Sequence, residues 1–211
     1  DLIVHPHHRY EMASIGPQLL SEALNVIREA GGGHVHWWVF EPNEIHTTLA
    51  QSIGLHAGRT MLQMRVALPL REVTDIVTTP FRSGVDDERW LAVNNAAFAD
   101  HLEQGGWTQS TLESRIQEPW FNPNGFLLHN VGDELAGFCW TKVHDEFVNQ
   151  DPVGELYVIG VHPDHAHKGI GRAVSIEAMN YLAKKGLKHS MLYVDADNEK
   201  GLALYKSLGF N

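Results

Sequence analysis

The residues with the clearest chemical potential form one continuous stretch, Glu155–Arg172, with the sequence ELYVIGVHPDHAHKGIGR. An apolar segment typical of a strand runs into a loop with Gly169 and Gly171, and an amphipathic run typical of a helix follows. Glycines let a backbone approach a ligand closely, and the free N–H groups and dipole of a helix start favour an anion. Lys168 and Arg172 add positive charge. We interpret the loop as a pyrophosphate site, with a plain strand–helix turn as the alternative.

A carboxylate stands at the start of this strand. Glu155 lies four residues before Ile159, and period-two alternation would place Glu155, Tyr157 and Ile159 on the same face of a sheet. The Glu155 carboxylate would then look into the cleft that holds the ligand of the loop. The alternative is a solvated glutamate at a strand end.

Two histidine clusters offer a rival chemistry. They comprise His5, His7 and His8 near the start of the chain, and His162, His165 and His167 in the loop. Zinc sites need three or four ligands in a fixed geometry, and the sequence has neither an H-E-x-x-H motif nor a second cysteine. We therefore expect exposed loop histidines and no metal. Cys139 lies in an apolar run, where we expect a buried small hydrophobe rather than a nucleophile.

The chain contains an internal repeat, which indicates two related halves. Residues 4–27 and residues 161–182 each read Val-His-Pro, a polar stretch, Ile-Gly and an amphipathic run. Residues 38–55 and residues 193–210 each give a strand, a turn with Asn and a short helix ended by Gly. We therefore expect an α/β (α+β) protein with two domains, each a mixed, mostly antiparallel sheet flanked by helices.

The expected boundary separates residues 1–75 from residues 76–211. The second domain is predicted to open with a strand, and Asp86 is the expected cap of its first helix. The expected strands lie at 77–81, 125–130, 134–144, 155–161 and 190–194, and the expected longer helices at 86–100, 111–117 and 171–185. Trp107 and Trp140 suit the wall of a site or a packed core equally well.

Composition excludes several functional classes. Among 211 residues, 26 acidic side chains outnumber 16 Lys and Arg, so the formal net charge is −10 and we expect no nucleic-acid partner. No apolar run approaches the roughly 20 residues that span a bilayer, so we expect no membrane association. The single cysteine excludes an intrachain disulfide and fits a reducing, cytoplasmic location. We expect a monomer. We also expect that the true beginning of the chain is missing, because the sequence starts without Met inside an apolar run.

Three segments together resemble the GCN5-related N-acetyltransferase (GNAT) superfamily: residues 156–161, 166–171 and 198–210. The resemblance implies a GNAT fold, acetyl-CoA as co-substrate and a final strand after Asn211. The family loop begins with Gln or Arg where this chain has Ala166, which lowers the expected affinity for the cofactor. The resemblance assigns cofactor contacts to Ile159, Gly160, Val161, Ala166, His167, Lys168, Gly169, Ile170, Gly171, Arg172, Asn198 and Lys200, and to Leu2, Ile3 and Val4 in the first half.

Four separated strings narrow the resemblance to the mycothiol acetyltransferases. They lie at residues 93–107, 137–144, 154–161 and 193–198. That family transfers acetyl from acetyl-CoA to the cysteinyl amine of cysteinyl-glucosaminyl-inositol, the last step of mycothiol biosynthesis. The resemblance therefore implies this small-molecule amine as the substrate. Two alternatives stay open: a GNAT enzyme for another amine, such as a protein N-terminus or an aminoglycoside, and a non-catalytic acyl-CoA sensor.

The resemblance also implies roles for single residues. An α-amine ordinarily has a pKa of about 7.7–8.0, so a carboxylate is an adequate base for removing its proton, directly or through one water. In the resembled family the matching glutamate lies near the acceptor amine, which makes Glu155 the candidate base. Tyr205 matches the family tyrosine at the CoA sulfur and is the candidate acid, with a buried structural tyrosine as the alternative. Backbone N–H groups of residues 159–161 are candidate donors to the developing oxyanion. Ala50 aligns with Tyr205, so we expect a non-catalytic first domain. The acceptor contacts are assigned to Asp100, Lys142, Glu155 and Tyr193.

Overall fold

The computed structural model describes residues 5–101, 104–145 and 151–211 of the chain. The chain divides into two compact units, Asp1–Arg59 and Thr60–Asn211, called here the N-terminal and the C-terminal unit. The cofactor contacts expected at Leu2, Ile3 and Val4 lie outside the described residues.

The N-terminal unit is a helical pair. Its elements are η1 (Pro6–Glu11), α1 (Met12–Glu29) and α2 (Glu44–Ser52). Asn43 begins α2 because its side-chain oxygen accepts hydrogen bonds from the N–H groups of Ile45 at 3.0 Å and His46 at 3.3 Å. Where the helices meet, Leu49 packs so closely on Gly16 that a Cβ atom there would lie 2.6 Å from its side chain.

The strand expected at the start of residues 38–55 does not form. A strand needs a neighbour for its backbone N–H and C=O groups, and no other strand occurs in the described part of this unit. The expectation of two sheet-containing domains is therefore not confirmed, whereas the short helix expected after Asn43 is present.

The C-terminal unit is built on one mixed sheet flanked by helices, as predicted. Its strands are β1 (Met61–Ala67), β2 (Thr79–Pro80), β3 (Phe126–Val131), β4 (Glu134–His144), β5 (Val153–Val161) and β6 (His189–Asp195). Its helices are α3 (Asp87–Ala97), α4 (Gln109–Ile116), α5 (Ile170–Lys184) and α6 (Glu199–Ser207), with short 3-10 turns η2 (Pro123–Gly125) and η3 (Pro163–His165). The strand order is β1-β6-β5-β4-β3-β2, and the pairing is antiparallel except between β5 and β6.

Sequence reasoning missed β1. This strand pairs with β6 along its whole length, from Met61 opposite Asp195 to Ala67 opposite His189. The structure therefore divides the chain at residues 59 and 60, ahead of the expected boundary at residues 75 and 76. The physical reason is that a strand belongs to the sheet that satisfies its backbone groups, wherever the connecting loop lies. On its other edge, Arg65 exchanges backbone hydrogen bonds of 2.9 and 3.0 Å with Asn211.

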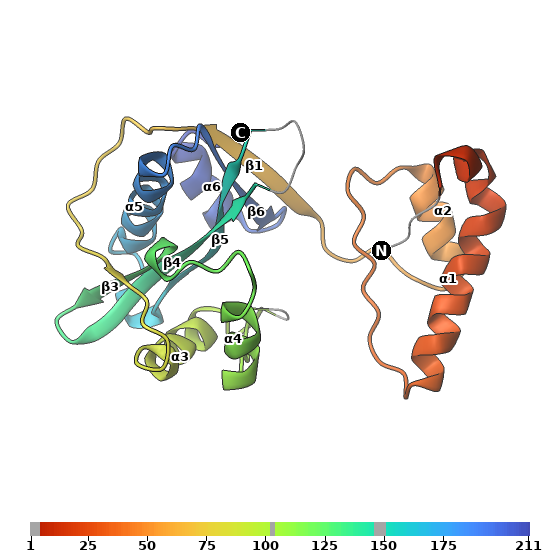
Figure 1. The fold of residues 1–211 in the computed structure, drawn as a ribbon, viewed down its shortest axis with the longest axis horizontal. Coiled ribbons are helices and arrows are strands. Elements are labelled where there is room, and N and C mark those ends of the chain that lie inside the picture. The colour runs from red at the N-terminus through yellow and green to blue at the C-terminus, as the bar shows by residue number, and fades with distance from the viewer. Residues whose placement is uncertain (1–4, 102–103, 146–150) are drawn as a thin grey trace. The chain divides into compact units, whose positions relative to one another are not determined.

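Helices cover both faces of the sheet, with α3 and α4 on one side and α5 and α6 on the other (Figure 1). The α3 side holds an aromatic cluster in which the Trp140 ring stacks on Phe126 at 4.3 Å and meets Trp90 edge-on at 5.9 Å. Trp107 and Trp140 are both buried there, so they belong to the core. Cys139 is fully buried in the core on the α5 side, and burial raises the pKa of its thiol, as expected for a small hydrophobe.

A bulge in β5 breaks the expected alternation. Trp140 lies opposite Val158 whereas Thr141 lies opposite Leu156, so Tyr157 is the extra residue. Tyr157 and Val158 accordingly both pack in the aromatic cluster on the α3 side, and Ile159 packs on the α5 side. The prediction that Glu155, Tyr157 and Ile159 share one face was wrong for Ile159.

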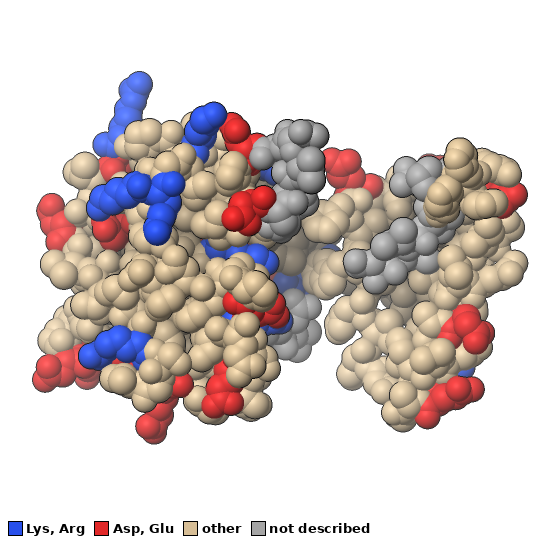
Figure 2. All heavy atoms as spheres, in the orientation of Figure 1, with Lys and Arg blue, Asp and Glu red and all other residues tan. Residues whose placement is uncertain are grey.

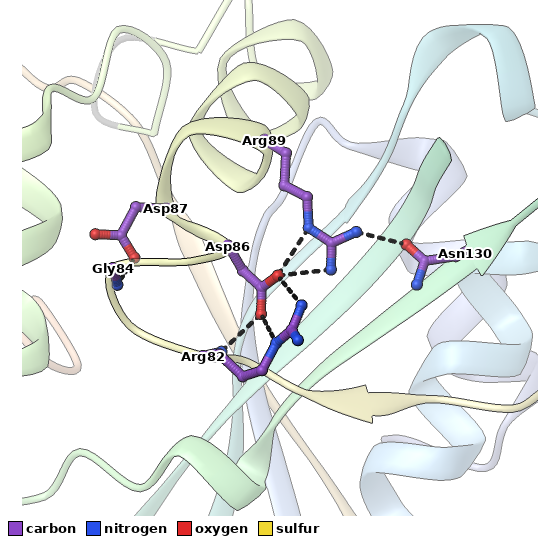
Figure 3. Close-up of polar contacts among 6 residues, drawn as sticks. All are labelled: Arg82, Gly84, Asp86, Asp87, Arg89 and Asn130. Carbon is purple, nitrogen blue, oxygen red and sulfur yellow. Dashed lines mark hydrogen bonds and ion pairs between the residues drawn. The ribbon is translucent and has the colours of Figure 1, made fainter. Parts of the chain in front are cut away.

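Buried Asp86 anchors the start of α3 (Figure 3). Its carboxylate accepts hydrogen bonds from the Arg82 backbone N–H at 2.8 Å, from the Arg82 guanidinium at 2.9 and 3.0 Å, and from Arg89 Nε at 2.9 Å. Arg89 in turn donates to Asn130 on β3 at 3.1 Å. Asp86 does lie at the helix start, but its side chain makes no capping bond and instead ties α3 to the sheet.

Candidate active site

The site begins where β5 and β6 separate. The two strands pair only at Gly154 with Ser190 and Glu155 with Met191, although β5 continues against β4 as far as Val161. Beyond Glu155 the β6 edge of β5 is therefore open. Residues 159–161, whose N–H groups are the candidate oxyanion donors, lie along this open edge.

The predicted pyrophosphate loop follows β5 directly. Gly169 has a φ of 80° and lies at the N-cap of α5, where no side chain caps the helix. The first helical hydrogen bond runs from the N–H of Ala173 to the carbonyl of Gly169, so the N–H groups before Ala173 lie at the free helix start. An anion fits this arrangement because those groups and the helix dipole both favour negative charge.

The two basic side chains of the loop and helix start donate hydrogen bonds within the protein. Lys168 is exposed and donates to the backbone carbonyl of Asp164 at 3.0 Å, and Arg172 donates to the Ser207 hydroxyl at 2.7 Å. His167 is exposed with a φ of 60°, and Ala166 is half-buried. Two further predicted cofactor residues lie at the start of α6. Asn198 caps this helix by accepting a hydrogen bond from the N–H of Gly201 at 2.9 Å, and Lys200 is exposed.

Glu155 is buried on the α3 side of the sheet, and so is not a solvated strand end. It is the direct cross-strand partner of Lys142 on β4, whose Nζ lies 4.7 Å from the centre of the Trp120 ring. Trp120 in turn meets Tyr157 edge-on at 5.1 Å. An acidic, a basic and two aromatic side chains thus gather beside the opening.

Sequence reasoning missed Trp120 and a second neighbour of Glu155, His144. His144 Nε2 lies 2.7 Å from Glu155 Oε2, and the two side chains are only 13% and 9% exposed. His144 closes the string of residues 137–144, and it lies two positions from Lys142 on the same strand. That spacing on a strand was the available signal, because residues two apart share a face.

The β6 side of the opening carries two further side chains on this face. Leu192 and Val194 pack on the α5 side, so Tyr193 and Asp195 point to the α3 side. The Tyr193 hydroxyl accepts a hydrogen bond from Gln63 on β1 at 2.7 Å. Asp195 pairs with His101 at 3.6 Å.

Glu155, Lys142 and Tyr193 therefore share one face. Asp100 is exposed in the turn after α3, directly before His101, the residue that pairs with Asp195 at 3.6 Å. The fourth predicted acceptor residue is therefore adjacent in the chain to a residue that contacts Asp195 on this face.

Tyr205 approaches from the other side of the sheet. It lies on α6, packs against the core on the α5 side and meets the Phe210 ring at 5.9 Å. Burial raises the pKa of its hydroxyl above the usual value, with the nearby Cys139 thiol as a smaller cause. The hydroxyl therefore stays protonated at neutral pH, as a proton donor must.

No group of three or more His, Cys, Asp or Glu side chains that suits a metal occurs among the described residues. Within the same residues, no helix combines the length and the apolar character needed to cross a bilayer. Figure 2 shows acidic and basic side chains interspersed over the visible face of the C-terminal unit.

Comparison with known proteins identifies the family of the chain. The family model described as "Acetyltransferase (GNAT) family" matches residues 90–210. The structure of a GCN5-related N-acetyltransferase from Sphaerobacter thermophilus superposes with a TM-score of 0.73 at 20% identity, covering 99% of this chain and 67% of that one. The ribosomal-protein-S18-alanine N-acetyltransferase of Escherichia coli gives 0.52 at 26% identity, covering 64% and 77%. The chain therefore belongs to the GNAT acetyltransferase family.

Sequence relatives narrow the family. The mycothiol acetyltransferase of Acidothermus cellulolyticus is 40% identical over 225 residues, which span all of this chain and 67% of the relative. That of Thermobispora bispora is 41% identical over 216 residues, spanning all of this chain and 71% of the relative. Within the GNAT family, the chain belongs to the mycothiol acetyltransferases. The expected enzyme class, an acetyl-CoA-dependent N-acetyltransferase, is confirmed.

Proposed function

We propose that this chain transfers the acetyl group of acetyl-CoA to the cysteinyl amine of cysteinyl-glucosaminyl-inositol. The observation that carries the proposal is a buried carboxylate, Glu155, at the point where β5 leaves β6. Lys142 and Tyr193 share its face, and an uncapped helix start follows the other end of the same strand. Strand β5 thus carries the proposed base near one end and leads to the proposed anion site at its other end. The proposed acceptor-binding residues lie on the neighbouring strands β4 and β6.

Each residue of the proposed mechanism has a separate role. Acetyl-CoA supplies the activated thioester, with its phosphates at the loop of residues 166–172 and near Asn198 and Lys200. Glu155 takes a proton from the amine, directly or through one water, as the new N–C bond forms. Backbone N–H groups of residues 159–161 stabilise the negative charge on the carbonyl oxygen. Tyr205 gives its proton to the sulfur as the C–S bond breaks.

The positions of Glu155 and Tyr205 support this division. Glu155 lies on the α3 side and Tyr205 on the α5 side of the sheet, so base and acid approach the opening of β5 and β6 from opposite faces. An amine entering from one face and a thiolate leaving toward the other never compete for the same group. The acceptor is rich in hydroxyl groups, and Lys142 and Tyr193 are the side chains that we assign to them, with Asp100 at the rim.

The test is direct acetylation. The protein is incubated with acetyl-CoA and cysteinyl-glucosaminyl-inositol, and the N-acetylated product is followed by mass spectrometry, since the acceptor's own thiol obscures release of CoA. We expect product from the native protein, and at least about 100-fold less from Glu155→Gln, which still binds acetyl-CoA in calorimetry. Glu88→Gln, an exposed change on α3, is the matched control. Faster acetylation of an aminoglycoside or of a peptide N-terminus would reject this acceptor.

A further inference from the structure

We infer that His144 is a positioning residue for Glu155. The inference rests on the proposed function, in which Glu155 is the base. The contact is short, 2.7 Å from His144 Nε2 to Glu155 Oε2, and both side chains are largely buried. Hydrogen bonds to a carboxylate at this distance are the strong, charge-assisted kind.

The sheet register makes this contact specific. His144 lies opposite Val153 on the neighbouring strand, so Glu155 is its diagonal neighbour on the same face. With Oε2 bound by His144, the other oxygen, Oε1, is the one left to meet an amine. A carboxylate on two rotatable bonds beyond Cβ would otherwise sample several rotamers. His144 therefore selects the Glu155 rotamer in which Oε1 is directed toward the acceptor amine.

Lys142 is a second basic residue beside Glu155, but its ammonium group lies over an aromatic ring. It lies over the Trp120 ring at 4.7 Å, a cation–π contact. The cation–π contact leaves N–H donors of Lys142 for a polar substrate, whereas His144 contacts the base itself. The two neighbours on β4 have separate tasks: one binds and one orients.

Three variants test the inference. His144→Ala and His144→Phe remove the donor, and the phenylalanine keeps the ring volume so that packing is preserved. His144→Gln restores an N–H donor at a similar reach. We expect kcat to fall about 10- to 100-fold in the first two and to recover within about threefold in the third. The KM for acetyl-CoA should stay within about twofold throughout, because the loop of residues 166–172 is untouched.

The control is His129→Ala, which removes a β3 histidine whose Nδ1 contacts the Val77 carbonyl at 2.9 Å, outside the proposed site. It should leave kcat unchanged. Thermal melting of every variant identifies a change that only unfolds the protein. Native-like kcat in His144→Phe or His144→Ala, or no recovery in His144→Gln relative to His144→Phe, overturns the inference.

A double-mutant comparison separates this inference from the proposed function. If His144 acts through Glu155, adding His144→Phe to Glu155→Gln lowers kcat by less than about twofold further. Normal turnover of Glu155→Gln alone would remove Glu155 as the base, and the proposed mechanism with it. An inactive Glu155→Gln together with a fully active His144→Phe would remove only the role of His144.

Discussion

Lys142 and Glu155 are direct cross-strand partners on β4 and β5, yet the Lys142 ammonium lies over the Trp120 ring. A cation held on an aromatic face beside a buried carboxylate has donors left for a ligand, since an ammonium group carries three N–H bonds. This arrangement leads to the first prediction about how the acceptor is held.

Replacement of Lys142 by Met should weaken acceptor binding selectively. The change keeps an unbranched apolar stem on Trp120 and removes the charged donor. Loss of one charged hydrogen bond corresponds to about 1.5 kcal/mol, or roughly a tenfold rise in the acceptor KM. The KM for acetyl-CoA should not change. Lys185→Met is the matched control, because Lys185 lies 5.7 Å over the Tyr181 ring in the same unit. Equal effects of the two changes in steady-state kinetics would contradict a role for Lys142.

Tyr205 gives a prediction about pH. Burial raises the pKa of its hydroxyl above the usual value of 10.0, so the acid form persists to more alkaline pH than for an exposed tyrosine. If Tyr205 is the acid, kcat should therefore not fall between about pH 8 and pH 10 through its ionisation. Tyr205→Phe should lower kcat about 10- to 100-fold. Tyr181→Phe, another tyrosine with a raised pKa, should not. An alkaline loss of kcat below about pH 9 that disappears in Tyr205→Phe would disprove this account.

Strong local patterns carried most of the fold prediction. The apolar run and flanking turn gave β4 its correct bounds, 134–144, and the Ile-Gly start with an apolar stripe placed α5 within one residue. Each of these signals lies within the segment itself. By contrast β1, the partner of β6, required knowledge of which sheet would receive it, and a pairing over more than 120 residues leaves no local trace.

For the site, too, local motifs were predictable and features that depend on strand pairing were not. The motif placed the loop before α5 and the carboxylate at the start of β5, but alternation failed at Tyr157, because a bulge is a property of two strands. His144 was missed for a related reason. His144 contacts Glu155 diagonally across β4 and β5, and the pairing register of these strands cannot be read from the sequence.

Two glycines of the loop should respond differently to alanine. Gly169 has a φ of 80°, a conformation that costs an L-residue about 1–2 kcal/mol, whereas a Cβ on Gly171 would meet Val161 at an ordinary 3.5 Å. Gly169→Ala should therefore raise the Kd for acetyl-CoA severalfold by shifting the start of α5, and Gly171→Ala much less. Calorimetric titration of acetyl-CoA into both variants measures the difference. Equal affinities would mean that the loop conformation does not matter for the cofactor.

Asp86 should be a major contributor to the stability of the C-terminal unit, because its carboxylate joins Arg82 to Arg89 on α3, which in turn binds Asn130 on β3. Asp86→Asn removes the charge and should cost about 2 kcal/mol of unfolding free energy. This estimate stays in the lower part of the range for charged hydrogen bonds because the Arg82 side chain is 65% exposed. Asp133→Asn, in an exposed turn, is the control.

The pH dependence of this stability has a defined sign. The hydrogen bond from Arg82 lowers the pKa of Asp86 below the usual value of 3.8. The carboxylate therefore contributes its full stability above that value, and the contribution is lost as the pH falls through the lowered pKa. In urea unfolding, the difference between the native protein and Asp86→Asn should be constant from about pH 7 to pH 5 and should shrink below about pH 4. A difference that persists unchanged in acid would show that Asp86 acts through its shape and neutral hydrogen bonds, and not through its charge.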